Sequence, residues 1–195
     1  MKRNIDVNDL PTVEALENEL KREKYRRRYA KLLRSTIYAL VIVAAVSVLV
    51  ATLLLPVLQI YGTSMTPGLD EGDIVVSVKG GELSAGDIVA FYYNNRILVK
   101  RVIALPGQRV NIDDDGNIYN DNVMVDEPYL AGKAAGQSDI AYPFTVPENT
   151  YFVLGDHRET SVDSRNSIIG CISPDEIVGK IVFRVWPLKD FGKVK

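Results

Sequence analysis

The sequence predicts a mostly β protein, an antiparallel β-sheet or partly closed barrel, preceded by a single transmembrane α-helix. Two observations carry this prediction. Residues 37–55 contain no charged side chain, and after Pro56 the apolar residues gather in short β-branched and aromatic runs bounded by Gly, Asp or Asn. With 195 residues, the chain is long enough for one medium-sized domain with its own core plus accessory segments.

The charged residues are distributed unevenly along the chain. The net charge is −2, but residues 1–34 hold ten Lys/Arg and six Asp/Glu, which leaves 13 basic and 19 acidic residues, a net charge of −6, for residues 35–195. A nucleic-acid-binding protein carries its positive charge on the folded part, so this distribution argues against that class. The single cysteine, Cys171, excludes an intrachain disulfide and is expected to be a buried apolar residue. With only one histidine, His157, the chain has no His/Cys cluster for zinc.

Residues 1–34 are expected to form a basic, largely helical segment. A helix is predicted over residues 9–34, with Asp9 or Thr12 as its N-cap. Most of the basic residues of this segment lie between Lys21 and Arg34, directly before the uncharged run. Their position predicts a role in orienting a membrane span.

Residues 35–56 are predicted to be that span. A helix made of the uncharged residues 37–55 is about 28 Å long, close to the hydrocarbon thickness of a bilayer. A buried core helix would show a polar face, and a cleaved signal peptide would have a shorter apolar run nearer the N-terminus, so an uncleaved anchor is favoured. Because basic residues mark the cytoplasmic end of a span, the N-terminus is expected in the cytoplasm of a single-pass protein of the cell membrane. Residues 57–195 are then expected to form an extracytoplasmic, β-rich catalytic domain.

Several strands are predicted in this domain, with a loop-rich insertion around residues 108–148 that is irregular between residues 126 and 145. Asn94 and Asn95 are expected to form a hairpin turn between the second and third strands. The predicted strands are residues 74–78, 87–93, 97–105, 109–112, 117–119, 123–125, 150–154 and 177–186.

Ser64 is a candidate nucleophile, although a serine among turn-forming residues commonly just caps a turn. A serine hydroxyl needs a neighbouring base, and the chain offers two, Lys100 and His157. In a strand, Lys100 shares one face with Leu98 and Val102, the apolar setting that a lysine base requires, although a lysine on an edge strand fits the same spacing. His157 lies in a polar loop, where a solvated histidine is the commoner outcome.

Four sequence boxes follow one another behind the predicted anchor. They are Gly62-x-Ser64-Met65-x-Pro67-x-Leu69, Gly86-Asp87-Ile88-Val89, Val99-Lys100-Arg101-Val102-Ile103-Ala104-Leu105-Pro106-Gly107 and Gly155-Asp156-x-Arg158-x-x-Ser161-x-Asp163-Ser164-Arg165. In residues, order and approximate spacing, these boxes resemble those of bacterial type I signal peptidases. The similarity covers nearly all of residues 56–187, and a single anchor before the serine box fits the smaller, Gram-positive-like members.

The resemblance implies a Ser-Lys endopeptidase that removes signal peptides from exported preproteins. Ser64 would attack the scissile carbonyl, and unprotonated Lys100 would act as the general base. Ser161 would orient the lysine, and Asp163 and Arg165 would form a supporting ion pair.

The oxyanion would be held at least by the backbone N–H of Ser64. Some relatives carry a serine two residues before the nucleophile as a second donor, but this chain has Gly62 there, so the second donor is not assigned. His157 also departs from the pattern, because many relatives have asparagine at this position. The intact Lys100 box nevertheless favours lysine as the base.

The expected partners are signal peptides with small residues before the cut, and membrane lipid; no nucleic acid, metal or organic cofactor is implied, and the oligomeric state is not predicted. Ser64 is only nine positions after Leu55, so the serine lies at most about 30 Å from the membrane surface. Two rival interpretations are a soluble Ser-Lys autoprotease of the LexA-like kind and a non-catalytic anchored β-domain that binds a partner. The anchor argues against the first, and the second gives Ser64 and Lys100 no role.

Overall fold

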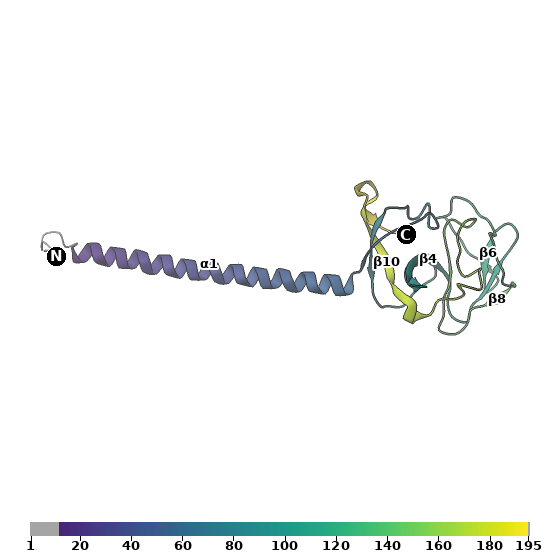
Figure 1. Ribbon diagram of the computed structural model, residues 1–195, viewed down its shortest axis with the longest axis horizontal. Coiled ribbons are helices and arrows are strands. Elements are labelled where there is room, and N and C mark those ends of the chain that lie inside the picture. Colours follow the sequence, from purple (N-terminus) through teal and green to yellow (C-terminus); the bar gives the residue numbers. More distant parts are fainter. Residues whose placement is uncertain (1–11, 195) are drawn as a thin grey trace. The chain divides into compact units, whose positions relative to one another are not determined.

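The computed structural model describes residues 12–194, apart from the side chain of Leu54. Its N-terminal element is one helix, α1 (Val13–Leu54), and the part of the chain from residue 51 onward forms a separate, mostly β unit (Figure 1). The predicted N-terminal helix and the predicted anchor are therefore one continuous element. The helix continues without a break from one to the other. At Thr36 the side-chain hydroxyl donates a hydrogen bond to the carbonyl of Leu32 at 3.0 Å, one turn earlier in the same helix.

The ends of α1 have local causes. The Thr12 hydroxyl accepts a hydrogen bond from the backbone N–H of Ala15 at 3.4 Å, so Thr12 caps the helix, whereas Asp9 lies outside the described residues. The helix stops just before Pro56, because a proline disfavours helical geometry in the residue that precedes it. Among the described helices, α1 is the one long and apolar enough to cross a membrane, with a mean hydropathy of 2.5 in its most apolar window.

The main sheet of the β unit has seven antiparallel strands and is open rather than closed into a barrel. Within the described residues, the terminal strands β1 (Val57–Gln59) and β9 (Phe152–Leu154) each pair on one side only, so the predicted antiparallel sheet is present and does not close into a barrel. The strand β11 (Gly192–Lys193) pairs with β10 outside the main order. That order is β1 (Val57–Gln59), β2 (Ile74–Val78), β10 (Ile177–Trp186), β3 (Ile88–Tyr93), β4 (Arg96–Ala104) and β9 (Phe152–Leu154).

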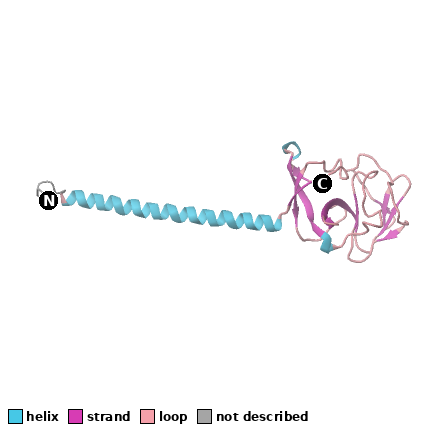
Figure 2. Ribbon diagram, viewed as in Figure 1, coloured by secondary structure: helices cyan, strands magenta, loops and turns pink. Residues whose placement is uncertain are grey.

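A second, four-stranded sheet lies within the segment predicted to be loop-rich. Between two of its strands, β7 (Val123–Met124) and β8 (Phe144–Thr145), the chain forms neither helix nor strand; Figure 2 draws loops in pink. The short 3-10 helices η2 (Pro174–Glu176) and η3 (Leu188–Asp190) flank β10. The order of the second sheet is β7 (Val123–Met124), β6 (Ile118–Asn120), β5 (Arg109–Ile112) and β8 (Phe144–Thr145).

The hairpin between β3 and β4 fixes the position of the candidate lysine. Asn94 and Asn95 both have positive φ, 44° and 61°, as a two-residue turn of type I′ requires. This turn pairs Tyr93 with Arg96, and the resulting register places Lys100 opposite Val89 of β3. A strand's side chains alternate between its two faces, so Lys100 and Arg101 point to opposite sides. Both are buried, because both faces of this part of β4 are covered.

The core of the β unit should respond differently to two neighbouring aromatic residues of β3. Phe91 is fully buried among apolar side chains, whereas Tyr92 is 56% exposed. We expect Phe91→Ala to lower the free energy of unfolding by about 3–5 kcal/mol, because it leaves a cavity. The matched variant Tyr92→Ala should change it by less than about 1 kcal/mol. Chemical denaturation of both variants checks this; equal losses would contradict the placement of the core.

Candidate active site

Ser64 lies on the loop that connects β1 to β2. The loop is closed at its base by backbone hydrogen bonds from Ile60 to Asp73 and from Gly72 back to Ile60, at 2.8 and 2.9 Å. Met65 is buried in the apolar core beneath it, which holds the serine in place from the inside. The loop therefore presents Ser64 from a fixed backbone.

Gly62 has a conformational reason to be glycine. Its φ is +80°, in the region that disfavours any side chain, and a Cβ built there would meet no atom within 4 Å. The glycine in place of a donor serine is thus explained by the backbone. The N–H of Ser64 donates no hydrogen bond to a described residue, so it is available for an oxyanion.

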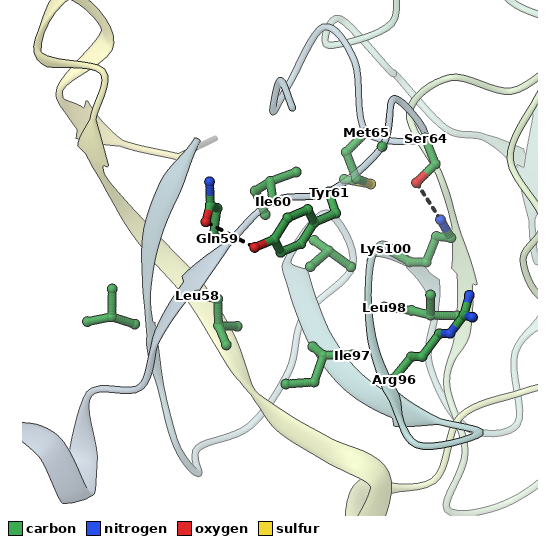
Figure 3. Close-up of a pocket in the computed structure, with 13 residues that line it drawn as sticks. Leu58, Gln59, Ile60, Tyr61, Ser64, Met65, Arg96, Ile97, Leu98 and Lys100 are labelled. Carbon is green, nitrogen blue, oxygen red and sulfur yellow. Dashed lines mark hydrogen bonds between the residues drawn. The ribbon is translucent and has the colours of Figure 1, made fainter. Parts of the chain in front are cut away.

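Lys100 meets Ser64 across the site. Its Nζ lies 2.7 Å from the Ser64 Oγ and donates a hydrogen bond to it, although the two residues are 36 positions apart in the chain (Figure 3). The lysine is only 3% exposed. Burial lowers the pKa of Lys100 from 10.5 to about 8, a shift opposed by the nearby Asp163 carboxylate and reinforced by Arg165. An amine with this pKa is partly neutral near physiological pH.

The serine and the lysine stand at one end of a pocket. One wall is the chain of residues 57–62 and the other is residues 96–100, so two extended segments border the space (Figure 3). Apolar side chains line it, among them Leu58, Ile60 and Met65. The pocket therefore lies between two segments of main chain, with Ser64 and Lys100 among its lining residues.

The predicted supporting ion pair is present next to the site. The Arg165 guanidinium donates to both carboxylate oxygens of Asp163, from Nε at 2.8 Å and from Nη2 at 2.9 Å, and both side chains are buried. Asp163 also accepts the backbone N–H of Gly155 at 3.0 Å. The pair therefore fixes the position of the loop that follows β9.

Ser161 is close to the nucleophile, but it does not form the hydrogen bond to Lys100 that the resemblance implied. Its Oγ is buried and has no hydrogen-bond partner among the described residues. A Cβ placed on Gly155 would collide with this Oγ and with the carbonyl oxygen of Ser64. Gly155 therefore lies between the side chain of Ser161 and the backbone of Ser64, and both are close to it.

His157 contacts Ser64 through its backbone rather than its ring. Its N–H donates to the Ser64 carbonyl at 3.0 Å, while its buried Nδ1 has no hydrogen-bond partner in the described part of the chain. The preceding Asp156 is paired with Arg101, which donates hydrogen bonds to both of its carboxylate oxygens, and it forms no hydrogen bond with the His157 ring among the described residues. The arrangement favours Lys100 over His157 as the base.

Three residues of the neighbourhood were given no role by the sequence. Arg101 binds Asp156, and its guanidinium carbon lies 3.8 Å from the centre of the Tyr129 ring. Glu127 forms a buried ion pair with Arg158. Because Lys100 and Arg101 are consecutive in a strand and point to opposite faces, the sequence could have indicated a buried partner for Arg101. Glu127 and Tyr129 lie in an irregular segment, where no sequence pattern indicates their role.

A serine and a buried lysine at the end of an apolar groove are typical of serine peptidases that use a lysine base. A family model described as signal peptidase, peptidase S26, matches residues 33–186. A signal peptidase IB of Staphylococcus aureus (strain COL) is 39% identical over 152 residues, which are 68% of this chain and 78% of the relative. The chain therefore belongs to the signal peptidase family, peptidase S26, and is a serine peptidase.

A second relative agrees with this assignment. A signal peptidase I of Bacillus caldolyticus is 38% identical over 162 residues, covering 73% of this chain and 87% of the relative. A crystal structure of a signal peptidase I from Enterococcus faecalis V583 shares 33% sequence identity, with a TM-score of 0.45, and the match covers 51% of this chain and 97% of that chain.

The buried lysine should cost stability at neutral pH. The pKa of Lys100 in the folded protein is about 8, below the 10.5 of an unperturbed lysine. The folded protein must therefore hold a buried ammonium below about pH 8, and it releases this proton at a lower pH than the unfolded chain does. We expect Lys100→Met to raise the free energy of unfolding at pH 7 by on the order of 2 kcal/mol. The gain should shrink as the pH rises from about 8 to 10.5.

Denaturation at pH 7 and pH 10 checks this, with the exposed Lys79→Met as the matched control, for which we expect little change at either pH. A Lys100→Met variant that is less stable than the wild type at pH 7, or whose gain does not depend on pH, would contradict the burial argument.

Proposed function

We propose that this chain is a membrane-anchored endopeptidase that removes N-terminal signal peptides from exported preproteins, with Ser64 as the nucleophile and Lys100 as its general base. The observation that carries the proposal is the 2.7 Å hydrogen bond between the Lys100 Nζ and the Ser64 Oγ at the end of the groove. Membership of the signal peptidase family supports the substrate class. The pairing of serine with a buried lysine supports the mechanism.

In the acylation step, neutral Lys100 accepts the hydroxyl proton of Ser64 while the Oγ forms a bond to the carbonyl carbon of the peptide. The backbone N–H of Ser64 is placed to stabilise the resulting oxyanion, a contribution of about 10²–10³ in rate for one such donor. The Lys100 ammonium then gives the proton to the leaving amine as the carbon–nitrogen bond breaks.

In the deacylation step, a water molecule gives its proton to Lys100 and attacks the ester carbonyl. The bond from carbon to the Ser64 Oγ then breaks, and the proton returns to that oxygen. Lys100 therefore alternates between base and acid, which suits a group with a pKa of about 8 at neutral pH. Asp163, Arg165 and Ser161 support the site by holding the loop behind Ser64, not by direct proton transfer.

The groove and the anchor together define the substrate. Extended segments on both sides of the groove offer backbone groups and shallow apolar walls, which suit small side chains before the cleavage site. A signal peptide held in a bilayer presents its cleavage site near the membrane surface, after small residues. We place residues 1–34 in the cytoplasm, residues 35–56 in the bilayer and residues 57–195 on the extracytoplasmic face of the cell membrane.

Removing either member of the dyad should abolish cleavage. We expect Ser64→Ala and Lys100→Ala each to lower kcat/KM by more than about 10³-fold, because each deletes a group that forms or breaks bonds. His157→Ala should retain most of the activity, since its backbone N–H remains. Purified protein is incubated with a preprotein, and the products are sized. Robust cleavage by Lys100→Ala would rule out the dyad, and an equal loss in His157→Ala would favour a histidine base.

The pH dependence should report Lys100. The base must be neutral, so kcat/KM should be low in acid, rise with pH and reach a plateau, with an apparent pKa of about 8. The measurement is a pH–rate profile on a peptide that spans a cleavage site. A midpoint near 10.5, the value for an unperturbed lysine, would mean that burial does not tune this group.

A further inference from the structure

Three buried arginine–carboxylate pairs surround the loop that follows β9. Two of them involve residues of the sequence boxes only. The third joins the loop to the irregular segment after β7, to which neither the motifs nor the proposed chemistry gives a role. The pairs are Arg101–Asp156, Arg165–Asp163 and Arg158–Glu127.

The Arg158 side chain is held from two sides. Its Nη1 donates to Glu127 Oε2 at 3.2 Å, its Nη2 donates to Glu127 Oε1, and its Nε donates to the carbonyl of Gly155 at 3.1 Å. Arg158 is 2% exposed and Glu127 is 6% exposed. Because a guanidinium is planar and rigid, the carboxylate on one side fixes where the Gly155 carbonyl lies on the other.

Gly155 and the residues that follow it form the support behind the nucleophile. A side chain at Gly155 would collide with the carbonyl oxygen of Ser64, so the two backbones are in close contact. Two residues further on, the N–H of His157 donates to that same carbonyl at 3.0 Å. A shift of Gly155 therefore moves Ser64.

Tyr129 links the same carboxylate to the strand that carries Lys100. Its hydroxyl donates to Glu127 Oε1 at 2.7 Å, and its ring stacks on the Arg101 guanidinium at 3.8 Å. Arg101 follows Lys100 directly in β4. Burial and the neighbouring carboxylate raise the pKa of the Tyr129 phenol, so the group remains a hydrogen-bond donor at neutral pH.

We propose that Glu127, assisted by Tyr129, is a positioning residue for the peptidase reaction, because it holds Arg158 and through it the backbone support of Ser64. This inference rests on the proposed function. A misplacement of about 1 Å at a reacting group can lower a rate by about 10²-fold, so the effect is measurable although Glu127 itself touches no reacting atom.

The test separates positioning from stability with a double variant, Glu127→Met with Arg158→Met. Replacing a buried ion pair by apolar residues of similar volume is commonly neutral or stabilising, whereas removing one partner strands a charge. We expect the double variant to melt within about 5 °C of the wild type. We also expect its kcat for a cleavage-site peptide to fall by about tenfold or more, with KM changed by less than about threefold and the same apparent pKa in the pH–rate profile.

The exposed carboxylate beside Glu127 provides the matched control, Asp126→Asn, which should keep the kcat of the wild type. A folded double variant with the kcat of the wild type would overturn the proposal, as would a loss confined to KM. If the double variant does not fold, Glu127→Gln is measured in the same way and judged by the same two results. Ser64→Ala, measured in parallel, reports on the proposed function separately: if it remains active, the dyad fails whatever Glu127 does.

Discussion

The burial of Lys100 is the constraint on which the rest of the site depends. An ammonium in a nearly dry environment is costly, and this cost brings its pKa to about 8. An exposed lysine would be protonated at neutral pH and could not accept the proton of Ser64. The type I′ turn at residues 94–95 sets the register that puts Lys100 opposite Val89 of β3, and the buried Met65 holds the loop that carries Ser64. Fold and chemistry are therefore coupled through one hydrogen bond of 2.7 Å.

The carboxylates near Lys100 are each paired with an arginine. These ion pairs hold the loop after β9 in place, and no unpaired carboxylate stands beside the amine among the described residues. Asp163 raises the pKa of Lys100, but Arg165, which is paired with it, acts in the opposite direction. Asp156 is likewise neutralised by Arg101. Buried ion pairs of this kind contribute little to stability compared with apolar residues, so their presence here is better explained by the geometry that they impose.

Much of the fold followed from the sequence because the strands are strongly β-branched and Asn94-Asn95 has the chemistry of a tight turn. The single helix and the antiparallel sheets agree with that prediction, but the open edges do not close into a barrel. The strands β1, β8 and β11 were missed because each has only two or three residues and, unlike the equally short β6 and β7, is not bounded by an Asp-Gly or Asn-Asp-Asn turn. Sequence spacing alone could not decide whether Lys100 is a catalytic base, since Lys100 and Ser64 are 36 positions apart and only the tertiary structure brings them together. Glu127 was missed for the same reason.

The titration of Lys100 in the intact protein tests the central claim most directly. With lysine side chains labelled with ¹³C at Cε, nuclear magnetic resonance follows each ammonium separately, and the Lys100→Arg variant identifies the signal of interest. We predict one signal that titrates with a midpoint of about 8 and is absent from the Lys100→Arg variant. If no signal titrates below about pH 10, or if the low signal persists in Lys100→Arg, Lys100 is not the tuned base of this site.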